Sequence, residues 1–235
     1  MSDMARRIEE NLAAVNDRMS RAATRSGRAP GDVRLVAVTK YVDIATTRLL
    51  CAVGCRDLGE SRPQQLWNKA AALDDAGVRW HMIGSLQRNK IARLLPRASL
   101  IHAGDSLRLL QAIQEAAQSG GHPPVPLLLE VNVSGDAAKH GFAPDEIEPL
   151  LPQLAALTSL RIRGLMAMSG LDSDAQATRA EFAKLRQLRD RLASVAPPGL
   201  SLDELSMGMS GDFEIAIEEG ATIIRVGSAL FEGVL

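Results

Sequence analysis

The sequence predicts an α/β protein, a closed (β/α)8 TIM barrel of parallel strands that is preceded by an N-terminal helix. Eight short apolar stretches alternate with helical stretches along the 235 residues, and strict alternation is typical of parallel βα units. The chain length suits one such barrel, so we expect a single domain over residues 1–235. No glycine-rich dinucleotide motif follows the first apolar stretch, which disfavours an open doubly wound sheet.

Composition and charge restrict the function classes. The formal net charge is −1, and Lys and Arg are interleaved with Asp and Glu along the helical stretches, so we expect no nucleic-acid partner. The N-terminus lacks the apolar core of a secretory signal, and no apolar run is long enough to span a membrane, which predicts a cytoplasmic protein without a membrane partner. Cys51 and Cys55 lie in a predicted helix without metal-ligand neighbours, and we expect both to be buried apolar residues and no metal site.

The first half of the chain supplies the N-terminal helix and four strand–helix pairs. Apolar residues recur at steps of four, three and four from Ile8 to Met19, which is the stripe of an amphipathic helix that ends near Gly27. Strands are predicted at 34–40, 55–60, 78–84 and 98–102, of which the second and fourth are short. Helices are predicted at 44–53, 64–76, 86–95 and 106–119. Their boundary signals are Gly54, Gly77 and Pro96 as stops, and Asp105 or Ser106 as the cap of the fourth.

The second half of the chain supplies four more strands. The stretch 126–132 is apolar without alternation, as expected for a strand buried on both faces of a parallel sheet. A helix at 144–157 and a strand at 162–168 follow, and the plainest helix of the chain, at 173–195, ends at a Pro-Pro-Gly segment. Strands at 202–207 and 222–226 flank a helix at 212–219, for which Gly220 is the stop signal.

Ligands of such barrels bind at the carboxyl ends of the strands, and the first strand ends on Lys40. An apolar strand has no packing need for an ammonium group at its tip. Desolvation there can lower the pKa of the lysine and leave its amine able to attack an aldehyde. Lys40 is therefore the candidate Schiff-base lysine, and the alternative is a surface lysine that caps the strand.

Glycine and serine dominate the loops after the seventh and eighth strands. Backbone N–H groups of such loops can bind a phosphate without steric hindrance. The residues that fit this role are Gly208, Ser210, Gly227 and Ser228. Ser206 and Met209 lie in the first of the two loops, and we include them among the expected cofactor contacts. The alternative for each loop is an ordinary turn.

Arg225 ends the eighth strand, where its guanidinium would point towards the barrel mouth and needs an anion or a ring acceptor. The alternative is an ion pair with Glu60 or Glu130. A lysine for an aldehyde, a phosphate loop and an arginine beside a ring nitrogen are together the needs of pyridoxal 5′-phosphate (PLP). Because arginine is not an acid at neutral pH, it would leave the pyridine nitrogen unprotonated and weaken the cofactor as an electron sink.

Other strand ends carry polar or small residues that are candidates for the same mouth. They are Glu60, Ser61, Gly84, Asn132 and Ser134. His81 and Asn89 flank a glycine-containing turn, which permits an active-site role, although a histidine inside a strand is as often a satisfied core residue.

Seven motifs, taken in their order and spacing, carry a resemblance to a known family. They are Val38-Thr39-Lys40, Gly59-Glu60, His81-Met-Ile-Gly-Ser-Leu-Gln-Arg-Asn-Lys90, Glu130-Val-Asn132 with Lys139-His-Gly141, Gly164-Leu-Met-Ala-Met168, Ser206-Met-Gly-Met-Ser210 and Arg225-Val-Gly-Ser-Ala-Leu-Phe231. The chain resembles, over almost its whole length, the pyridoxal phosphate homeostasis proteins, single-domain relatives of the barrel domain of alanine racemase. The resemblance implies that Lys40 forms the Schiff base and that Arg225 faces the pyridine nitrogen. It implies phosphate contacts from Ser210, Gly227 and Ser228, and in this family a lysine at the place of Lys139 has been proposed as a second acceptor.

The sequence departs from the family pattern at two places. Ser61 stands where the family usually has asparagine, so an asparagine contact is absent. The usual Phe-Gly end appears as Phe231-Glu-Gly233, which alters the last turn and leaves the phosphate loop intact. Lys139 itself has a plain alternative, a solvated loop lysine.

We therefore expect a non-catalytic PLP-binding protein that buffers the vitamin B6 cofactor or delivers it to PLP-dependent apoenzymes, as a monomer or weak dimer. The alternative is a PLP-dependent amino-acid racemase, which needs a second acid/base on the opposite face of the cofactor. In alanine racemase a tyrosine of a separate domain fills that role. The only tyrosine here, Tyr41, adjoins Lys40 and is expected to project to the other side of the strand. A third possibility is a barrel enzyme for another phosphorylated metabolite with Lys40 as an aldolase-like base.

Overall fold

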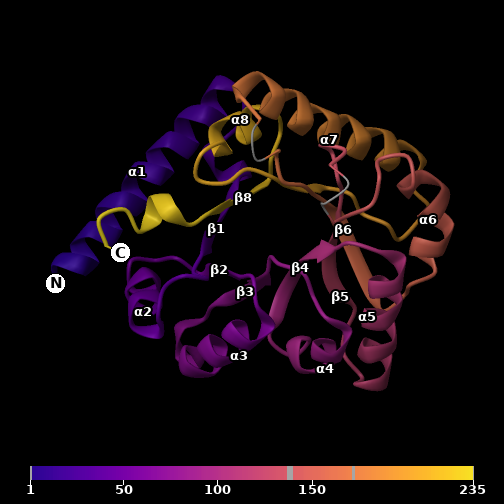
Figure 1. Ribbon diagram of the computed structural model, residues 1–235, viewed down its shortest axis with the longest axis horizontal. Coiled ribbons are helices and arrows are strands. Elements are labelled where there is room, and N and C mark those ends of the chain that lie inside the picture. The colour runs from indigo at the N-terminus through magenta and orange to yellow at the C-terminus, as the bar shows by residue number, and fades with distance from the viewer. Residues whose placement is uncertain (1, 137–139, 171–172, 235) are drawn as a thin grey trace.

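The computed structural model is a closed barrel in which eight parallel strands follow one another in sequence order. The structure describes residues 2–136, 140–170 and 173–234. Helices surround the strands on the outside, and the last strand pairs with the first (Figure 1). The predicted (β/α)8 barrel is therefore confirmed.

The strands are β1 Arg34–Val38, β2 Asp57–Glu60, β3 Arg79–Met82, β4 Ala98–Gly104, β5 Val125–Glu130, β6 Leu160–Met166, β7 Glu204–Ser206 and β8 Ile223–Val226. The α-helices are α1 Asp3–Arg25, α2 Ile44–Ala52, α3 Pro63–Ala72, α4 Ile91–Leu94, α5 Leu107–Ser119, α6 Ile147–Ala155, α7 Ala175–Val195 and α8 Phe213–Glu218. Four 3-10 turns complete the fold: η1 Pro30–Asp32, η2 Asp74–Ala76, η3 Arg88–Lys90 and η4 Ser228–Leu230.

Three boundary predictions are wrong. The helix expected at 86–95 shrinks to η3 and α4, because Gln87 is extended at φ −72° and ψ 136° while the chain crosses from β3 to the helix layer. The fourth strand is not short, since β4 continues to Gly104, which pairs with Leu129 of β5. Cys55 lies beyond the end of α2 and is only half-buried, whereas Cys51 is buried as expected.

Helix α1 packs along the outside of the barrel against α8 and η4 (Figure 1). Of its predicted apolar stripe, Ile8, Val15 and Met19 are buried, and Leu12 is partly buried against the same core. At the polar edge, Arg18 forms an ion pair with Glu214 of α8, with Nε 2.6 Å from Oε1. The side-chain amide of Asn11 donates to the carbonyl oxygens of Leu230 and Glu232, which ties α1 to the C-terminal segment.

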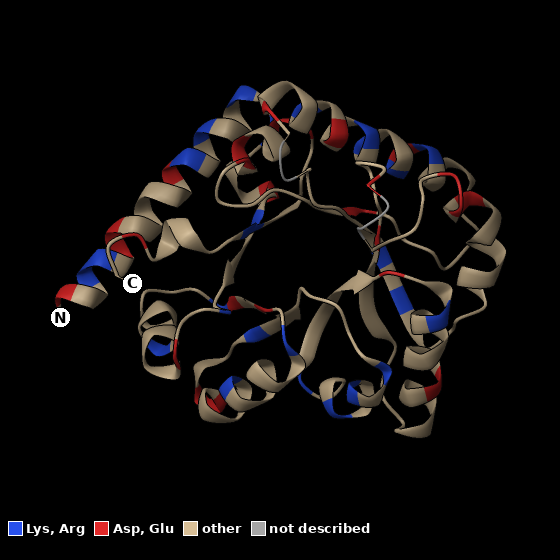
Figure 2. Cartoon of the chain, viewed as in Figure 1, with Lys and Arg blue, Asp and Glu red and all other residues tan. Residues whose placement is uncertain are grey.

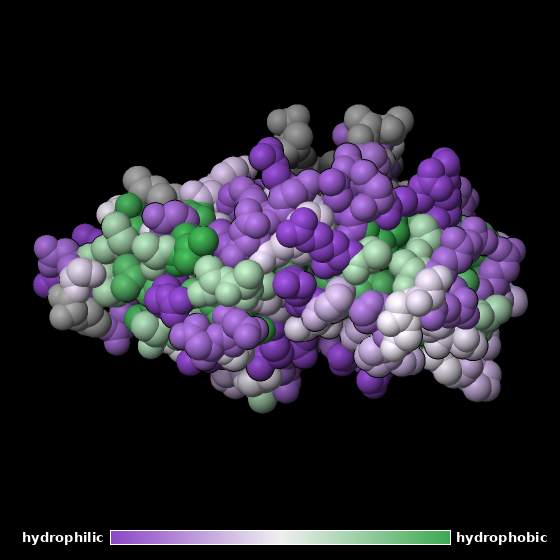
Figure 3. Space-filling view, turned by 90° about the horizontal axis from the view of Figure 1, so that it is seen from below, coloured by the Kyte–Doolittle hydropathy of each residue, from purple (hydrophilic) through white to green (hydrophobic). Residues whose placement is uncertain are grey.

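Acidic and basic residues alternate along the outer helices, as the sequence predicts (Figure 2). In a second view, hydrophilic side chains are interspersed with separate hydrophobic areas (Figure 3). Within the described ranges, none of the helices combines the length and apolarity needed to cross a bilayer.

The inside of the barrel holds a small apolar cluster and a set of polar side chains. The cluster draws its members from five different strands: Val36, Leu100, Ala103, Leu128, Met166 and Ile223. Buried polar residues occur on the strands as well, namely Asp57, Glu60, His81, His102, Glu130, Glu204, Ser206 and Arg225. Such barrels are usually filled by layers of bulky aliphatic side chains. This interior is therefore unusually polar.

The contact between β6 and β7 depends on a glycine. A Cβ on Gly164, whose φ is +156°, would lie 1.9 Å from the carbonyl oxygen of Glu204. We expect Gly164→Ala to lower the free energy of unfolding by about 3 kcal/mol or more, because the two strands cannot both keep their places. Urea denaturation measures the change, and Gly31→Ala, where an added Cβ meets nothing within 4 Å, is the matched control. Equal stability of the two variants would contradict the prediction.

Candidate functional site

Lys40 lies in the turn directly after β1, at the mouth of the barrel, and is half-buried. Its Nζ atom lies 4.8 Å from the centroid of the Tyr41 ring, and Tyr41 is 80% exposed. The expectation that Tyr41 projects away from Lys40 is therefore wrong. Side chains alternate only within a strand, and β1 already ends at Val38.

The peptide before Lys40 is held by a buried ion pair. Lys69 of α3 donates from Nζ to the carbonyl oxygen of Thr39 and to Glu60 Oε1, each at 2.6 Å. The hydroxyl of Thr39 donates to the same carboxylate oxygen at 2.6 Å, and its backbone N–H donates to the carbonyl of Gly59 at 3.0 Å. Glu60 therefore serves as a fully buried anchor beneath Lys40. The sequence signal for Lys69 was a lone lysine on the apolar face of a helix, beside Leu66 and Ala70.

Arg225 is buried and forms hydrogen bonds only with neutral acceptors among the described residues. Nη1 donates to Ser206 Oγ at 2.6 Å and to the Ser206 carbonyl at 2.9 Å, and Nη2 donates to the Ala167 carbonyl at 3.0 Å. These three bonds leave two of the five guanidinium N–H groups for a ligand. Burial lowers the pKa of Arg225 to about 10, against the opposing charges of Asp212 and Glu130, so the side chain stays charged at neutral pH.

The loops after β7 and β8 meet at Ser210, as predicted. Its Oγ accepts the backbone N–H of Gly227 at 3.2 Å and of Ala229 at 3.4 Å. Gly208 has a φ of +93°, and a Cβ there would lie 2.5 Å from the Cβ of Ala216, so the tight turn requires glycine. Ser228 begins η4. The sequence did not single out the N–H of Ala229.

Met209 and Asp212 close the far side of this loop. The N–H of Met209 donates to Asp212 Oδ1 at 2.6 Å, and Ser169 Oγ donates to Asp212 Oδ2 at 2.7 Å. The Met209 side chain is 39% exposed, so any cofactor contact of Met209 would come from its side chain.

Glu130 ends β5 and is buried. Burial, then the charge of Asp105, raises the pKa of Glu130, while His140 and Arg225 oppose the shift. Glu130 therefore holds a proton more readily than an ordinary glutamate. It makes no ion pair with Arg225 within the described ranges.

The loop after β5 uses its polar residues internally. The side-chain oxygen of Asn132 accepts from Ser134 Oγ and from the backbone N–H of Gly135, both at 3.1 Å. Its amide nitrogen donates to the Asp136 carbonyl at 2.7 Å. Lys139 lies outside the described residues.

His81 is buried in the barrel interior, between Asp57 and His102. Neither of those two partners was predicted from the sequence. The available signal was a histidine in the middle of the apolar run 98–104.

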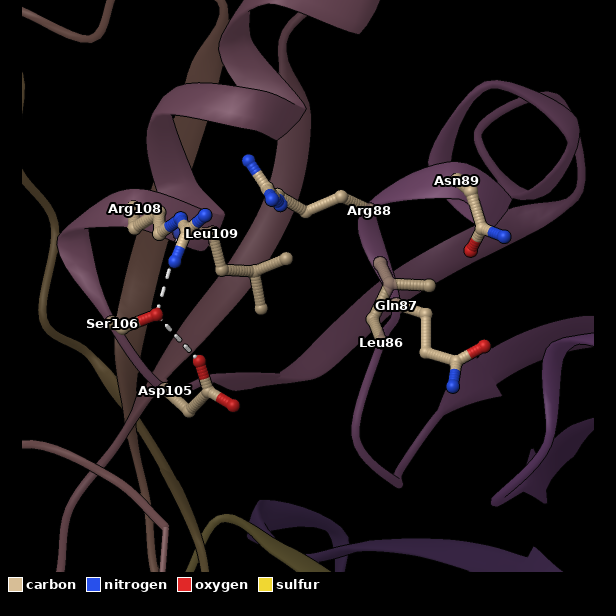
Figure 4. Close-up of a pocket in the computed structure, with 8 residues that line it drawn as sticks. All are labelled: Leu86, Gln87, Arg88, Asn89, Asp105, Ser106, Arg108 and Leu109. Carbon is tan, nitrogen blue, oxygen red and sulfur yellow. Dashed lines mark hydrogen bonds between the residues drawn. The ribbon is translucent and has the colours of Figure 1, made fainter.

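Asn89 lines an open pocket of about 560 Å³ between the loops after β3 and β4 (Figure 4). The other lining residues are Leu86, Gln87, Arg88, Asp105, Ser106, Arg108 and Leu109. Ser106 caps α5 by accepting the N–H of Leu109 at 3.3 Å, which settles the choice between Asp105 and Ser106. None of the predicted cofactor contacts lines this pocket.

Nearby, Gly84 packs on the backbone of Ser61, where an added Cβ would lie 2.4 Å from the Ser61 carbonyl oxygen.

Comparison with known proteins places this barrel in one class. The family model described as the N-terminal domain of alanine racemase matches residues 10–233. The pyridoxal phosphate homeostasis protein of Pseudomonas aeruginosa is 42% identical over 224 residues, which cover 95% of this chain and 94% of that protein.

Solved structures agree with this class. PipY of Synechococcus elongatus PCC7942, in a structure with PLP bound, superposes with a TM-score of 0.83 at 38% identity and covers 95% of this chain and 99% of that chain. An unknown protein from Bifidobacterium adolescentis superposes with a TM-score of 0.90 at 37% identity, covering 98% of this chain and 97% of that chain. The chain belongs to the alanine racemase N-terminal domain family and, within it, to the pyridoxal phosphate homeostasis proteins.

The buried ion pair beneath Lys40 gives a stability prediction. Lys69→Met should lower the free energy of unfolding by about 3–5 kcal/mol, because it leaves the buried Glu60 carboxylate without its counter-charge. Glu60 Oε2 already lacks a hydrogen-bond partner in the described part of the chain, so little can compensate. Urea denaturation measures the loss. The control is Lys184→Met at an exposed position of α7, for which we expect the free energy of unfolding to change by no more than about 0.5 kcal/mol. An equally small change for Lys69→Met would argue against the ion pair.

Proposed function

We propose that this protein binds PLP at the barrel mouth through a covalent bond to Lys40, and that it buffers or delivers this vitamin B6 cofactor without a reaction of its own. The recipients would be PLP-dependent apoenzymes in the cytoplasm, and the protein would act as a single-domain monomer or weak dimer. The observation that carries the proposal is the meeting of three groups at neighbouring strand ends: Lys40 after β1, Arg225 on β8, and the Ser210 loop after β7. The PipY structure with PLP bound supports PLP as the ligand of this barrel.

The residues present fit the cofactor. PLP supplies an aldehyde that condenses with an amine, together with a phosphate and a pyridine nitrogen. Lys40 would provide the amine. The N–H groups of Gly227 and Ala229 converge on Ser210 Oγ, and a phosphate that displaced this hydroxyl would accept from both. We also propose cofactor contacts from Ser228, Ser206 and Met209. Ser206 would act on the ligand only through its hydrogen bond with Arg225.

Arg225 would affect how strongly the bound cofactor withdraws electrons. Its two remaining N–H groups can donate to the ring nitrogen, but the guanidinium stays protonated at neutral pH and does not release its proton. A ring nitrogen that only accepts a hydrogen bond withdraws electrons weakly. This environment favours a protein that retains the cofactor over an enzyme that stabilises carbanions on it.

The alternative is an amino-acid racemase, and one observation favours it. Glu130 is a buried carboxyl at the mouth whose raised pKa suits proton transfer. Against it, Tyr41 lies on the Lys40 ammonium and does not face it from the opposite side of a ligand.

We expect borohydride reduction of the PLP-loaded protein, followed by peptide mass mapping, to place the pyridoxyl group on Lys40. The reason is that, among the lysines the structure describes, Lys40 combines a strand-end position with the neighbouring proposed phosphate loop. Pyridoxal, which lacks the phosphate, is the matched ligand control and should be retained far less well. Labelling confined to Lys90 or Lys139, or equal retention of the two ligands, would refute the site.

We expect no amino-acid racemisation at ordinary enzymatic rates, on the order of one turnover per second. The measurement is exchange of the α-proton in deuterated water for a panel of L- and D-amino acids. Lys40→Ala and Glu130→Gln are the informative variants, because they remove the two candidate bases. Exchange accompanied by interconversion of the enantiomers at such rates, and abolished in Lys40→Ala, would establish the racemase.

A further inference from the structure

A continuous run of five polar side chains crosses the barrel interior. Asp57 Oδ1 lies 3.0 Å from His81 Nε2, and His81 Nδ1 lies 2.9 Å from His102 Nε2. His102 Nδ1 lies 2.9 Å from Ser206 Oγ, and the same oxygen accepts from Arg225 at 2.6 Å. The run starts at the first residue of β2, where Arg79 also holds Asp57, and ends at the mouth.

All five residues are buried: Asp57 is 8% exposed, His81 1%, His102 and Ser206 0%, and Arg225 4%. Burying polar groups is costly unless each is hydrogen-bonded, and aliphatic side chains are the usual filling of such a barrel. Here each member is bonded to the next, so the chain forms a complete polar network. Complete networks orient their members strongly.

The two ends define the direction of every bond in the chain. Arg225 can only donate. Burial alone would raise the pKa of Asp57, but hydrogen bonds from His81 and Arg79 lower it well below its ordinary value, so the carboxylate can only accept. Ser206 accepts from Arg225, and its hydroxyl hydrogen donates to His102 Nδ1, because no other acceptor lies near it among the described residues. His102 then donates from Nε2 to His81 Nδ1, and His81 donates from Nε2 to Asp57.

The opposite order fails on physical grounds. It would need a charged His81 that donates from both nitrogens, and hence a second buried positive charge in the same barrel. His102 would then donate to Ser206, and the hydroxyl hydrogen of this fully buried serine would have no acceptor among the described residues. Burial lowers the pKa of His102 well below its ordinary value, so this ring is neutral in either order.

We propose that Asp57, His81, His102 and Ser206 form a one-directional hydrogen-bonded chain that positions Arg225 for the pyridine nitrogen of PLP. The chain turns the lone pairs of Ser206 towards Arg225, and together with the Ala167 carbonyl they fix the plane of the guanidinium. The two unused N–H groups are thereby held for the ligand. The inference rests on the proposed function in taking PLP as that ligand; Asp57, His81 and His102 are positioning residues that act through Arg225.

The first test needs no cofactor. Nitrogen-15 NMR of the histidine-labelled protein at neutral pH should show His81 and His102 as neutral rings protonated at Nε2, with His122 and His140 as reference signals from outside the chain. A charged His81, or a His102 protonated at Nδ1, would overturn the proposed direction. This measurement on the unaltered protein stands even if a variant fails to fold.

The second test breaks the chain at its middle. His102→Leu removes both hydrogen bonds, whereas His102→Gln keeps one acceptor and one donor in the same side chain. PLP affinity, measured by absorbance titration, should fall by about tenfold or more in His102→Leu, comparable to losing a hydrogen bond to a charged group. The ring-nitrogen signal of ¹⁵N-labelled PLP should shift in this variant. His102→Gln should restore both readouts, and His122→Leu should leave both unchanged.

The outcomes separate the two proposals. A wild-type protein that binds PLP on Lys40, with a folded His102→Leu variant of unchanged affinity and unchanged ring-nitrogen signal, would overturn the positioning role alone. A wild-type protein that does not retain PLP would overturn the proposed function and the positioning role with it.

Discussion

Closure of the barrel by pairing β1 with β8 is the constraint on which the candidate site depends. Val36 lies opposite Arg225 and Ala37 opposite Val226, although the two strands stand at opposite ends of the barrel sequence. Because parallel strands in register end together, Lys40 after β1 and Gly227 and Ser228 after β8 reach the same place. Helix α1 supports this closure from outside, since Asn11 holds the carbonyl groups that follow β8.

Two buried cations near the mouth, Lys69 and Arg225, have different kinds of hydrogen-bond partner. Lys69 forms an ion pair with Glu60 at 2.6 Å and donates a hydrogen bond to the carbonyl oxygen of Thr39. Its charge is therefore compensated within the fold. Arg225 has only carbonyl and hydroxyl acceptors within the described ranges, and its positive charge stays available to a ligand. A buried ion pair is strongly destabilised when one partner is removed, whereas a fixed guanidinium with unused donors is suited to recognition. The first cation is therefore structural and the second is part of the proposed binding site.

The mouth combines fixed and accessible parts. Arg225 and the Thr39–Glu60–Lys69 cluster are buried, while Tyr41 beside Lys40 is 80% exposed. A buried floor beneath the half-buried Lys40 fits the proposed uptake and release of a cofactor.

The sequence by itself determined the barrel, the approximate places of the strands and the family. Strand and helix periods are local properties, so alternation of apolar and amphipathic stretches was enough to predict the fold, and Lys40, Ser210 and Gly227 followed from their places after strands. Three contacts were decided only by the tertiary structure. They are the ion pair of Lys69 with Glu60, the contact of the Tyr41 ring with Lys40, and the connection of Asp57 to Arg225 through His81, His102 and Ser206. Those contacts join residues of different strands and helices across the barrel, and their hydrogen bonds leave no periodic pattern in the chain. Tyr41 shows the limit most plainly, because it lies three residues beyond the end of β1 at Val38, where the alternation of side chains inside a strand no longer applies.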